Sequence, residues 1–249
     1  MNQIGSVFEE YSRYYDLLYL DKDYESETKY ITQLMSRNGI FDGEILEFGS
    51  GTGKHGRLLS DAGFKVHGIE LSHDMVEKAS VTPGFSCQQG DIRSIQMNRT
   101  YSAVLALFHV VSYQAKNADV QMVFSRASEH LDSGGLFIFD FWYTPAVYAM
   151  KPSVRIKRFS DTNLEITRIA EPEVKCNENV VDVNYSIVAN SDGVFSSVKE
   201  THQMRHFSLP EIDFISQITG FERVHSEEFL TGRETGENTW GVCVVLRKM

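Results

Sequence analysis

The sequence predicts an α/β fold: a doubly wound sheet with an antiparallel β insertion late in the chain. Three observations support this fold class. A short apolar run at residues 45–48 leads through closely spaced glycines into a segment with apolar residues at helical spacing. Strand-like apolar runs then alternate with helical segments up to residue 141. From 154 to 207, β-branched segments instead alternate with polar ones, which is typical of antiparallel strands.

The first part of the chain, residues 6–38, is expected to form helices, because apolar residues recur there at helical spacing. It is dense in tyrosine, with rings at positions 11, 14, 15, 19 and 24. Two interpretations stay open for this segment: helices that pack on the main domain, or a lid that closes over a bound cofactor.

The glycine-rich turn after residue 48 is suited to close contact with a ligand, since residues without Cβ let backbone N–H groups and a helix N-terminus approach it. Gly51, Gly53 and Gly56 satisfy the G-x-G-x-x-G spacing of dinucleotide-binding proteins. Gly49, however, directly follows the apolar run, and the carboxylate of Glu47 lies two residues before it. This early register argues against a dinucleotide.

Two further carboxylates follow strand-like runs, where a sheet of this type binds ligands. Residues 65–70 are expected to form a strand ending in Glu70, about 20 residues beyond the glycines, the spacing at which an acid accepts hydrogen bonds from ribose hydroxyls. Residues 85–89 predict a short third strand, and Asp91 and Ile92 follow it. Asp91 is expected to bond an adenine amino group while Ile92 packs on the ring.

The apolar run at 102–108 predicts the central parallel strand. His109 follows it directly and Tyr113 comes four residues later, so both are expected at the ligand-binding edge of the sheet. The alternative is a structural role for each: a hydrogen bond that closes the loop for His109, and aromatic packing for Tyr113. A helix over 117–131 and a fifth strand over 136–141 are expected next.

The segment from 154 to 207 predicts about four antiparallel strands inserted after the fifth parallel strand. They are expected at 155–159, 165–169, 180–188 and 194–207, with a hairpin turn at Ser191-Asp192-Gly193. A helix at 209–219 and strands at 221–229 and 240–247 complete the pattern. We therefore expect a cofactor-binding domain, residues 1–144 and 208–249, and an inserted β-sheet, residues 145–207, on the substrate side.

Composition and charge exclude several classes of protein. The net charge of −10 disfavours a nucleic-acid partner, because phosphate binding needs a basic face. No apolar stretch approaches the roughly 20 residues that span a bilayer, and the start of the chain lacks the pattern of a secretion signal. Three scattered cysteines suit neither a disulfide framework nor a zinc site. We expect a cytoplasmic protein that binds neither nucleic acid nor membrane.

Taken in order, these motifs resemble those of the class I S-adenosylmethionine (SAM) methyltransferases across nearly the whole chain. The resemblance rests on the Glu-x-Gly-x-Gly-x-Gly turn at 47–53, the Gly-Ile-Glu-Leu-Ser-His-Asp-Met run at 68–75 and the Gln-Gly-Asp-Ile-Arg run at 89–93. It implies a Rossmann-like seven-stranded sheet in the order 3-2-1-4-5-7-6, with the last strand antiparallel, and SAM as the cofactor. The residues it implies for SAM binding are Tyr15, Tyr24, Glu47, Gly49, Gly51, Gly53, Glu70, Leu71, Met75, Asp91, Ile92 and Leu107.

Within that family the chain is similar to bacterial N,N-dimethyltransferases that act on nucleotide-linked amino sugars. The similarity includes a Tyr-Asp-Leu-x-Tyr start at 15–19, the following Asp23-Tyr24 and the β insertion. Two places differ. Tyr113 stands where those enzymes carry a candidate base histidine, and their Ser-Gly-Arg-Gly segment, suited to a pyrophosphate, is Glu-Asn-Thr-Trp-Gly at 237–241. The resemblance implies a small-molecule acceptor, with an amino sugar as one candidate.

An amine acceptor must lose its proton before it attacks a methyl group, so the site needs a base or a group that holds the neutral amine. We expect His109 or Tyr113 in this role. His202 and His206 lie four residues apart on an expected strand, too far to share a metal, and we reject a zinc site. Basic side chains of the insertion either line the acceptor pocket or lie on a solvated sheet face: Arg155, Lys157, Arg158, Arg168 and Arg205.

Three functions stay open at this point. The first is a SAM-dependent methyltransferase whose small-molecule acceptor offers nitrogen or oxygen. The second is an NAD(P)-dependent oxidoreductase, favoured only by the glycine spacing. The third is a SAM-binding module without catalysis. A monomer and a homodimer are both compatible with the sequence.

Overall fold

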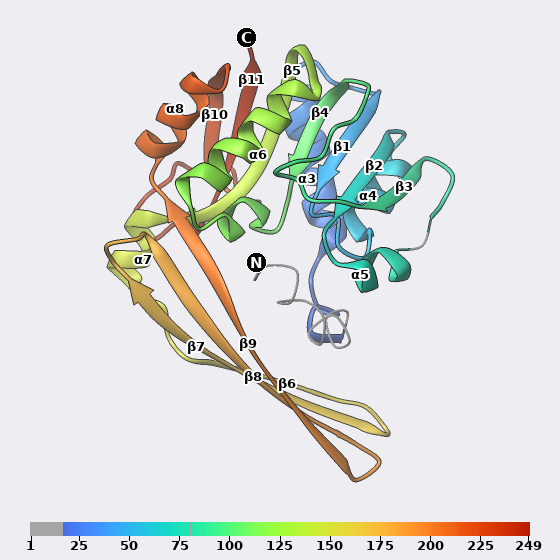
Figure 1. The fold of residues 1–249 in the computed structure, drawn as a ribbon, viewed down its shortest axis with the longest axis vertical. Coiled ribbons are helices and arrows are strands. Elements are labelled where there is room, and N and C mark those ends of the chain that lie inside the picture. Colours follow the sequence, from blue (N-terminus) through green and yellow to red (C-terminus); the bar gives the residue numbers. More distant parts are fainter. Residues whose placement is uncertain (1–16, 80) are drawn as a thin grey trace.

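The computed structural model describes residues 17–79 and 81–249, and Tyr15 with the helix expected before residue 17 lies outside them. The described chain forms a twisted sheet with helices on both faces, from which a long antiparallel arm extends (Figure 1). The second expected helix is present as α3 (Tyr24–Arg37), which begins where Asp23 accepts a hydrogen bond from the N–H of Ser26 at 2.9 Å.

The main sheet has the strand order that the resemblance implied. Its parallel strands are β1 (Glu44–Phe48), β2 (Lys65–Glu70), β3 (Phe85–Gln89), β4 (Tyr101–Ala106) and β5 (Leu131–Tyr143), arranged as β3-β2-β1-β4-β5. Antiparallel β11 (Gly241–Lys248) pairs with β5, and β10 (Phe221–Glu228) pairs with β11. In chain order this is 3-2-1-4-5-7-6, so the predicted fold class is confirmed.

Helices cover both faces because β5 is apolar on both sides. Phe137, Phe139 and Phe141 face one core, which α6 (Asn117–Glu129) and α8 (Leu209–Ile218) also enter. Leu136 and Ile138 face the other, with α3 and α4 (Lys54–Asp61). The alternation of side chains along a strand produces this division. Because side chains alternate, Asp140 is on the same side of β5 as Leu136 and Ile138, the side that α3 and α4 cover.

Several predicted boundaries differ from the structure, among them the end of α6 and the start of β5. The helix α6 ends at Glu129, two residues early, and Leu131 already pairs with Tyr101. The reason lies in His130, whose Nδ1 is 2.6 Å from the carbonyl oxygen of Arg126 while its Nε2 accepts the N–H of Met97 at 2.8 Å. The side chain thus ends the helix and ties it to the loop before β4.

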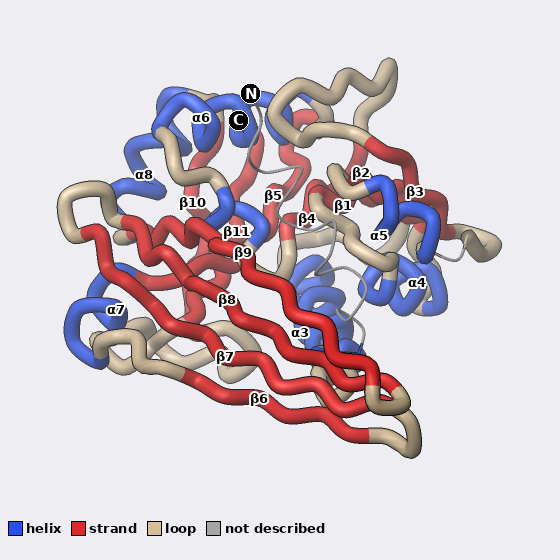
Figure 2. The backbone as a smooth tube through the Cα atoms, turned by 60° about the horizontal axis from the view of Figure 1, so that its bottom comes forward, coloured by secondary structure: helices blue, strands red, loops and turns tan. Residues whose placement is uncertain are grey.

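The inserted strands form one antiparallel sheet, here called the arm: β6 (Arg155–Ser160), β7 (Leu164–Lys175), β8 (Val180–Ser191) and β9 (Val194–Phe207). The predicted hairpin turn joins β8 to β9, with positive φ at Asp192 (52°) and Gly193 (85°), as a tight two-residue turn requires. The arm follows α7 (Thr144–Met150) and joins the main sheet where β9 pairs with the end of β5 (Figure 2).

Residues 17–23, here called the strap, directly precede α3 and contact the arm. Leu18 is buried against Ile166 and Ile187 of the arm, and Lys157 donates to its carbonyl oxygen. Arg168 donates to the hydroxyl of Tyr19 at 3.2 Å. Among the described residues, no helix is both long and apolar enough to cross a membrane.

Candidate active site

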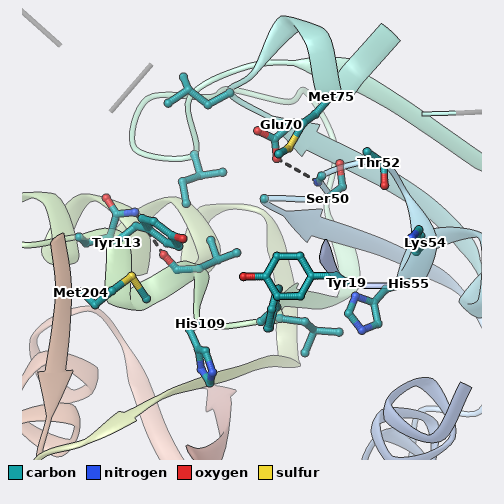
Figure 3. Close-up of a pocket in the computed structure, with 18 of the residues that line it drawn as sticks. Tyr19, Ser50, Thr52, Lys54, His55, Glu70, Met75, His109, Tyr113 and Met204 are labelled. Atoms are coloured by element: carbon teal, nitrogen blue, oxygen red, sulfur yellow. Dashed lines mark hydrogen bonds between the residues drawn. The ribbon is translucent and has the colours of Figure 1, made fainter. Parts of the chain in front are cut away.

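A cavity of about 400 Å³ lies at the carboxyl ends of β1, β2 and β4, between the main sheet and the arm (Figure 3). Eleven of the predicted site residues line it: Tyr24, Gly49, Gly51, Glu70, Leu71, Met75, Asp91, Ile92, Leu107, His109 and Tyr113. Glu47 and Gly53 lie behind the lining. The structure therefore brings the candidates from five separate segments to one place.

The glycine turn has a backbone that other residues adopt at a cost. Gly49 and Gly53 have φ of 67° and 76°, and Gly53 is the residue from which α4 begins. A Cβ at Gly53 would lie 2.5 Å from a ring carbon of Phe85, and one at Gly49 would lie 2.5 Å from Val110. Glycine is thus needed at both positions for backbone conformation and for close packing.

Glu70 holds the turn in place from the end of β2. Its carboxylate accepts the N–H of Gly51 at 2.9 Å (Figure 3) and that of Ser72 at 2.8 Å. Burial raises the pKa of Glu70, while these backbone hydrogen bonds oppose the rise. Each carboxylate oxygen has a second lone pair, so Glu70 retains capacity for hydroxyl donors in the cavity.

Glu47 supports the turn from below and is only 2% exposed. Burial and the nearby charge of Glu70 raise the pKa of Glu47 to about 8, although Arg57 opposes the rise. One of its oxygens lies 4.0 Å from Nδ1 of His55. A buried carboxyl of this kind is neutral near pH 7 and becomes charged when a cation approaches.

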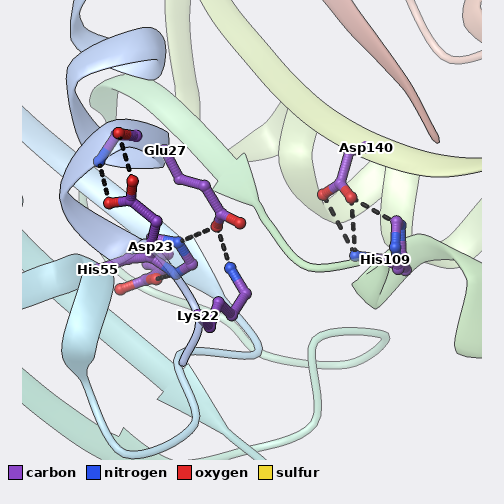
Figure 4. Close-up of polar contacts among 8 residues, drawn as sticks. Lys22, Asp23, Glu27, His55, His109 and Asp140 are labelled. Atoms are coloured by element: carbon purple, nitrogen blue, oxygen red, sulfur yellow. Dashed lines mark hydrogen bonds and ion pairs between the residues drawn. The ribbon is translucent and has the colours of Figure 1, made fainter. Parts of the chain in front are cut away.

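A buried ionic cluster fixes the strap to the start of α4 (Figure 4). Glu27 forms an ion pair with Lys22, and its carboxylate lies 2.7 Å from Nε2 of His55. Burial disfavours the charge on Glu27, but His55 and Lys22 hold its pKa below the ordinary value. The ammonium of Lys22 also lies over the rings of Tyr24 and Phe108, at 4.4 and 4.5 Å from their centres. The strap is thereby held at the edge of the cavity.

On the β3 side, Asp91 lines the cavity but already has a partner. Its carboxylate accepts from the backbone N–H and the guanidinium of Arg93, with contacts of 2.6 to 3.1 Å. Burial acts to raise the pKa of Asp91, and Arg93 outweighs it and lowers the pKa. Ile92 is 9% exposed beside it. The contact of Asp91 with an adenine amino group stays a prediction. Arg93 holds the Asp91 carboxylate in a fixed orientation for such a contact.

His109 lies on a strained loop and is paired with Asp140. Phe108 and His109 have φ of 66° and 63°, a conformation that bulky residues rarely adopt and that is concentrated at functional sites. The N–H of His109 donates to both oxygens of Asp140 at 3.2 Å (Figure 4). Its Nδ1 lies 2.6 Å from one of these oxygens.

Asp140 was missed by the sequence prediction. Its side chain is 1% exposed; burial acts to raise its pKa, but the contacts with His109 outweigh burial and lower it. The available signal was a single carboxylate within the otherwise apolar run 136–141. Buried charges of this kind are retained when they are paired.

Tyr113 belongs to a 3₁₀ turn, η1 (Val110–Tyr113), and reaches the arm. Its hydroxyl lies 3.1 Å from Nδ1 of His202, and burial raises its pKa well above the ordinary value. His206 has a different partner, the hydroxyl of Thr144 at 2.9 Å. The two histidines of β9 therefore make separate contacts.

The arm side of the cavity is aromatic, which the sequence prediction also missed. Trp142 and Trp240 pack with ring centres 5.4 Å apart, and both line the cavity with Tyr185 and Met204. Of the five basic residues considered for the acceptor pocket, Arg155 is the one that lines it. The only early signal for this wall was the presence of two tryptophans, since the sequence does not show that β5 and the start of β11 are adjacent.

Comparison with known proteins agrees with this geometry. Residues 45–135 match the family described as "Methyltransferase domain". The chain is 26% identical over 230 residues to a dTDP-3-amino-3,6-dideoxy-alpha-D-glucopyranose N,N-dimethyltransferase from Streptomyces fradiae, covering 91% of this chain and 88% of that protein. It is 28% identical over 200 residues to a dTDP-3-amino-3,4,6-trideoxy-alpha-D-glucopyranose N,N-dimethyltransferase from Streptomyces venezuelae, covering 78% of each.

Solved structures share the fold along the whole chain. The sugar N-methyltransferase KedS8 from Streptoalloteichus superposes with a TM-score of 0.83 at 18% identity, covering 100% of this chain and 96% of that one. SAM-bound CalS10, an amino pentose methyltransferase from Micromonospora echinaspora, gives a TM-score of 0.78 at 20% identity, covering 97% and 98%. The matched methyltransferase domain, the sheet order and the cavity at its edge identify this chain as a SAM-dependent methyltransferase with the class I fold, similar to the amino-sugar N,N-dimethyltransferases.

Proposed function

We propose that this enzyme transfers methyl groups from SAM to the amine of a nucleotide-linked amino sugar. The observation that carries the proposal is one cavity that combines the glycine turn with a His109–Asp140 pair and an aromatic wall of Trp142, Trp240 and Tyr185. The relatives from Streptomyces support the choice of acceptor, because their names specify dTDP-linked amino sugars and two methyl groups.

The residues around the turn fit SAM. Glu70 presents a carboxylate fixed by two backbone N–H groups, suited to ribose hydroxyls. Ile92 and Leu71 offer apolar contact for the adenine, and Asp91 an oriented carboxylate for its amino group. Glu47, buried with one oxygen lacking a partner among the described residues, suits a site where a cation arrives nearby. We assign SAM binding to the predicted set that lines the cavity, with Glu47 and Gly53 supporting it from behind.

When bound, SAM supplies a methyl group already activated for attack by a nucleophile. The remaining work for the chain is to hold the acceptor, exclude water and take up the proton of the amine. We assign the proton to His109. Asp140, charged and buried, holds the ring through Nδ1 and stabilises the positive imidazolium that forms, which leaves Nε2 for the acceptor.

We propose that residues 145–207 form the substrate-side part of the enzyme. Tyr185 and Met204 of the arm face the same cavity as the glycine turn, and aromatic rings suit the apolar faces of a sugar. Arg155, at the start of β6, lines the cavity on this side and suits a phosphate of the nucleotide. The similar enzymes carry an arginine in the segment that corresponds to residues 237–241 of this chain. Arg155 is our candidate for the role of that arginine.

The test is mass spectrometry of reactions with SAM and three acceptors: a dTDP-linked amino sugar, the matched hydroxy sugar and a simple amine. We expect products one and two methyl groups heavier on the amino sugar alone. The Asp140→Asn variant, which keeps the shape of the side chain, is expected to bind SAM normally and turn over slowly. Methylation of the hydroxy sugar or of the simple amine at equal rate would refute the proposed acceptor while leaving the methyltransferase assignment intact.

The cellular location and the oligomeric state stay predictions. Cys87, Cys176 and Cys243 are all free thiols, which is consistent with a reducing compartment. Sedimentation of the purified enzyme would distinguish the monomer from the homodimer.

A further inference from the structure

The two tryptophans of the chain lie together on the arm side of the cavity. Trp142 belongs to the end of β5 and Trp240 directly precedes β11, and the strand pairing places Gly241 opposite Trp142. The two ring centres are 5.4 Å apart and the ring planes are inclined by 58°. Both residues are half-buried and both line the cavity. The pair, here called the tryptophan corner, forms a wedge of aromatic surface that borders the cavity.

Backbone contacts hold the tryptophan corner in place. The carbonyl oxygen of Trp240 accepts the N–H of Tyr143 at 3.0 Å, and the N–H of Trp142 donates to the hydroxyl of Ser112 at 3.3 Å. The buried Thr239 closes the loop before Trp240, since its hydroxyl accepts a backbone N–H of the same loop at 3.0 Å. A site that is formed in advance loses little conformational freedom when a ligand binds.

The tryptophan corner lies beside the proposed base and its carboxylate. Trp142 and Asp140 are two residues apart on β5, so their side chains lie on the same side of the strand. The ring centre of His109 is 6.2 Å from that of Trp142, and a Cβ at Gly241 would lie 3.7 Å from Cε1 of His109. The buried carboxylate of Asp140 adds a negative charge beside the aromatic surface. A cation in this part of the cavity is therefore attracted both by the rings and by the carboxylate.

The reaction of an amine acceptor supplies such a cation. The acceptor is an ammonium before it gives its proton to His109, and it is an ammonium again after each methyl transfer. Every methyl group on that nitrogen replaces an N–H that could form a hydrogen bond, and it spreads the positive charge over an apolar surface. Aromatic rings, and tryptophan above all, attract cations of this kind within roughly 6 Å of the ring centre.

The indole rings are not already covered by a cation of the described chain. There, the lysines and arginines that lie over aromatic rings all do so at tyrosine or phenylalanine rings. The wedge between two indoles inclined by 58° also brings both rings within reach of one small cation.

We propose that the tryptophan corner is a binding subsite for a methylated ammonium, namely the acceptor nitrogen once it carries its first methyl group. This inference rests on the proposed function and assigns to one part of the cavity the distinction between a methylated and a primary amine. The corner holds the methyl group already present, and His109 takes the proton. The half-methylated acceptor is therefore bound more tightly than the primary amine and proceeds to the dimethylated product.

The decisive experiment separates attraction by charge from a merely apolar surface. The probes are choline and its carbon isostere, the alcohol in which carbon replaces the nitrogen of choline. Because the corner contains both tryptophans of the chain, tryptophan fluorescence reports binding at this place directly. With S-adenosylhomocysteine present, we expect choline to bind about tenfold more tightly than the carbon isostere. Equal affinity for the two, including undetectable binding of both, or displacement of SAM by choline would overturn the inference.

Variants of Trp240 test the ring itself, with Trp142 as the remaining fluorescent reporter. Trp240→Leu should weaken choline binding about tenfold and Trp240→Phe about threefold, while the affinity for the carbon isostere stays unchanged. Phe195→Leu, which removes an exposed ring near the tip of the arm, is the control and should change neither affinity. An equal loss for both ligands in Trp240→Leu would show an apolar surface only and would overturn the inference.

With an amino sugar as the acceptor, the tryptophan corner sets an order among the transfers. In the wild type, kcat/KM for the N-methyl amino sugar should exceed that for the primary amine about tenfold, because the charge on nitrogen is also present in the transition state. Trp240→Leu should abolish this preference, so the monomethylated product accumulates, and an unchanged preference would contradict the assignment. Selective choline binding without methylation of any amino sugar would instead refute the proposed function and retain the subsite.

Discussion

Replacing Glu47 with glutamine tests the electrostatics of the glycine turn. The carboxyl is 2% exposed, lies near the buried Glu70 and has one oxygen without a partner among the described residues. Its pKa is raised to about 8, mainly by burial. Between pH 5 and 8 the folded chain therefore holds a proton that the unfolded chain has lost. By linkage, the free energy of unfolding falls as the pH rises through this window.

The size of the effect follows from the pKa. Each pKa unit corresponds to about 1.4 kcal/mol, so moving from the ordinary 4.5 to about 8 amounts to roughly 5 kcal/mol. Glutamine has the same shape and no charge to bury, so Glu47→Gln should match the wild type near pH 5 and become more stable above it. We expect a gain of about 3 kcal/mol at pH 7 and roughly 5 kcal/mol at pH 9.

Binding of SAM should show the opposite preference. The positive charge of SAM favours the ionised carboxyl, so the wild type should release a proton on binding at pH 7, and Glu47→Gln should bind about tenfold more weakly. Urea denaturation from pH 5 to 9 measures the stability, and calorimetry in buffers of different ionisation enthalpy measures the proton. Glu44→Gln, on the exposed start of β1, is the control and should change neither. A stability difference between Glu47→Gln and wild type that does not vary with pH would refute the reasoning.

Three further outcomes are expected. Gly53→Ala combines a φ of 76° with a Cβ 2.5 Å from an aromatic ring carbon, so it should lower the free energy of unfolding in urea by about 2–5 kcal/mol. Gly63→Ala, with a φ of 100° and open space around it, should lower it by only about 1–2 kcal/mol. Equal losses in the two variants would contradict the packing argument. Asp140→Asn should lower kcat about 100-fold with SAM affinity unchanged, because the imidazolium of His109 loses its charge partner, and weakened SAM binding would count against this role. Arg155→Gln should raise the KM about tenfold for a nucleotide-linked sugar but not for the free amino sugar, and an equal rise for both would exclude a phosphate contact.

The fold and the cofactor half of the cavity follow from local patterns in the sequence. The glycine turn, Glu70 and Asp91 each come directly after an apolar strand, and parallel strands end at one edge of a sheet. Residues that are neighbours of strand ends are therefore neighbours in space, even though 44 positions separate Glu47 from Asp91. The same logic placed His109 and Tyr113 at the cavity. The β8–β9 turn was equally local, since its Asp-Gly pair suits the positive φ angles that a tight hairpin needs.

The partners of those residues depended on the tertiary structure. His109 contacts Asp140, 31 positions away, and Tyr113 contacts His202, 89 positions away. Lys157 binds Asp21 across 136 positions, so the strap meets the arm. These contacts depend on the register of β9 against β8 and on the place where the arm joins β5. Hydrophobic periodicity predicts neither of them. The sequence determined which edge of the sheet carries the site. The arm, folded back over that edge, decided which side chains complete it, because a side chain acquires its partner only when strand pairing brings distant segments within hydrogen-bond distance.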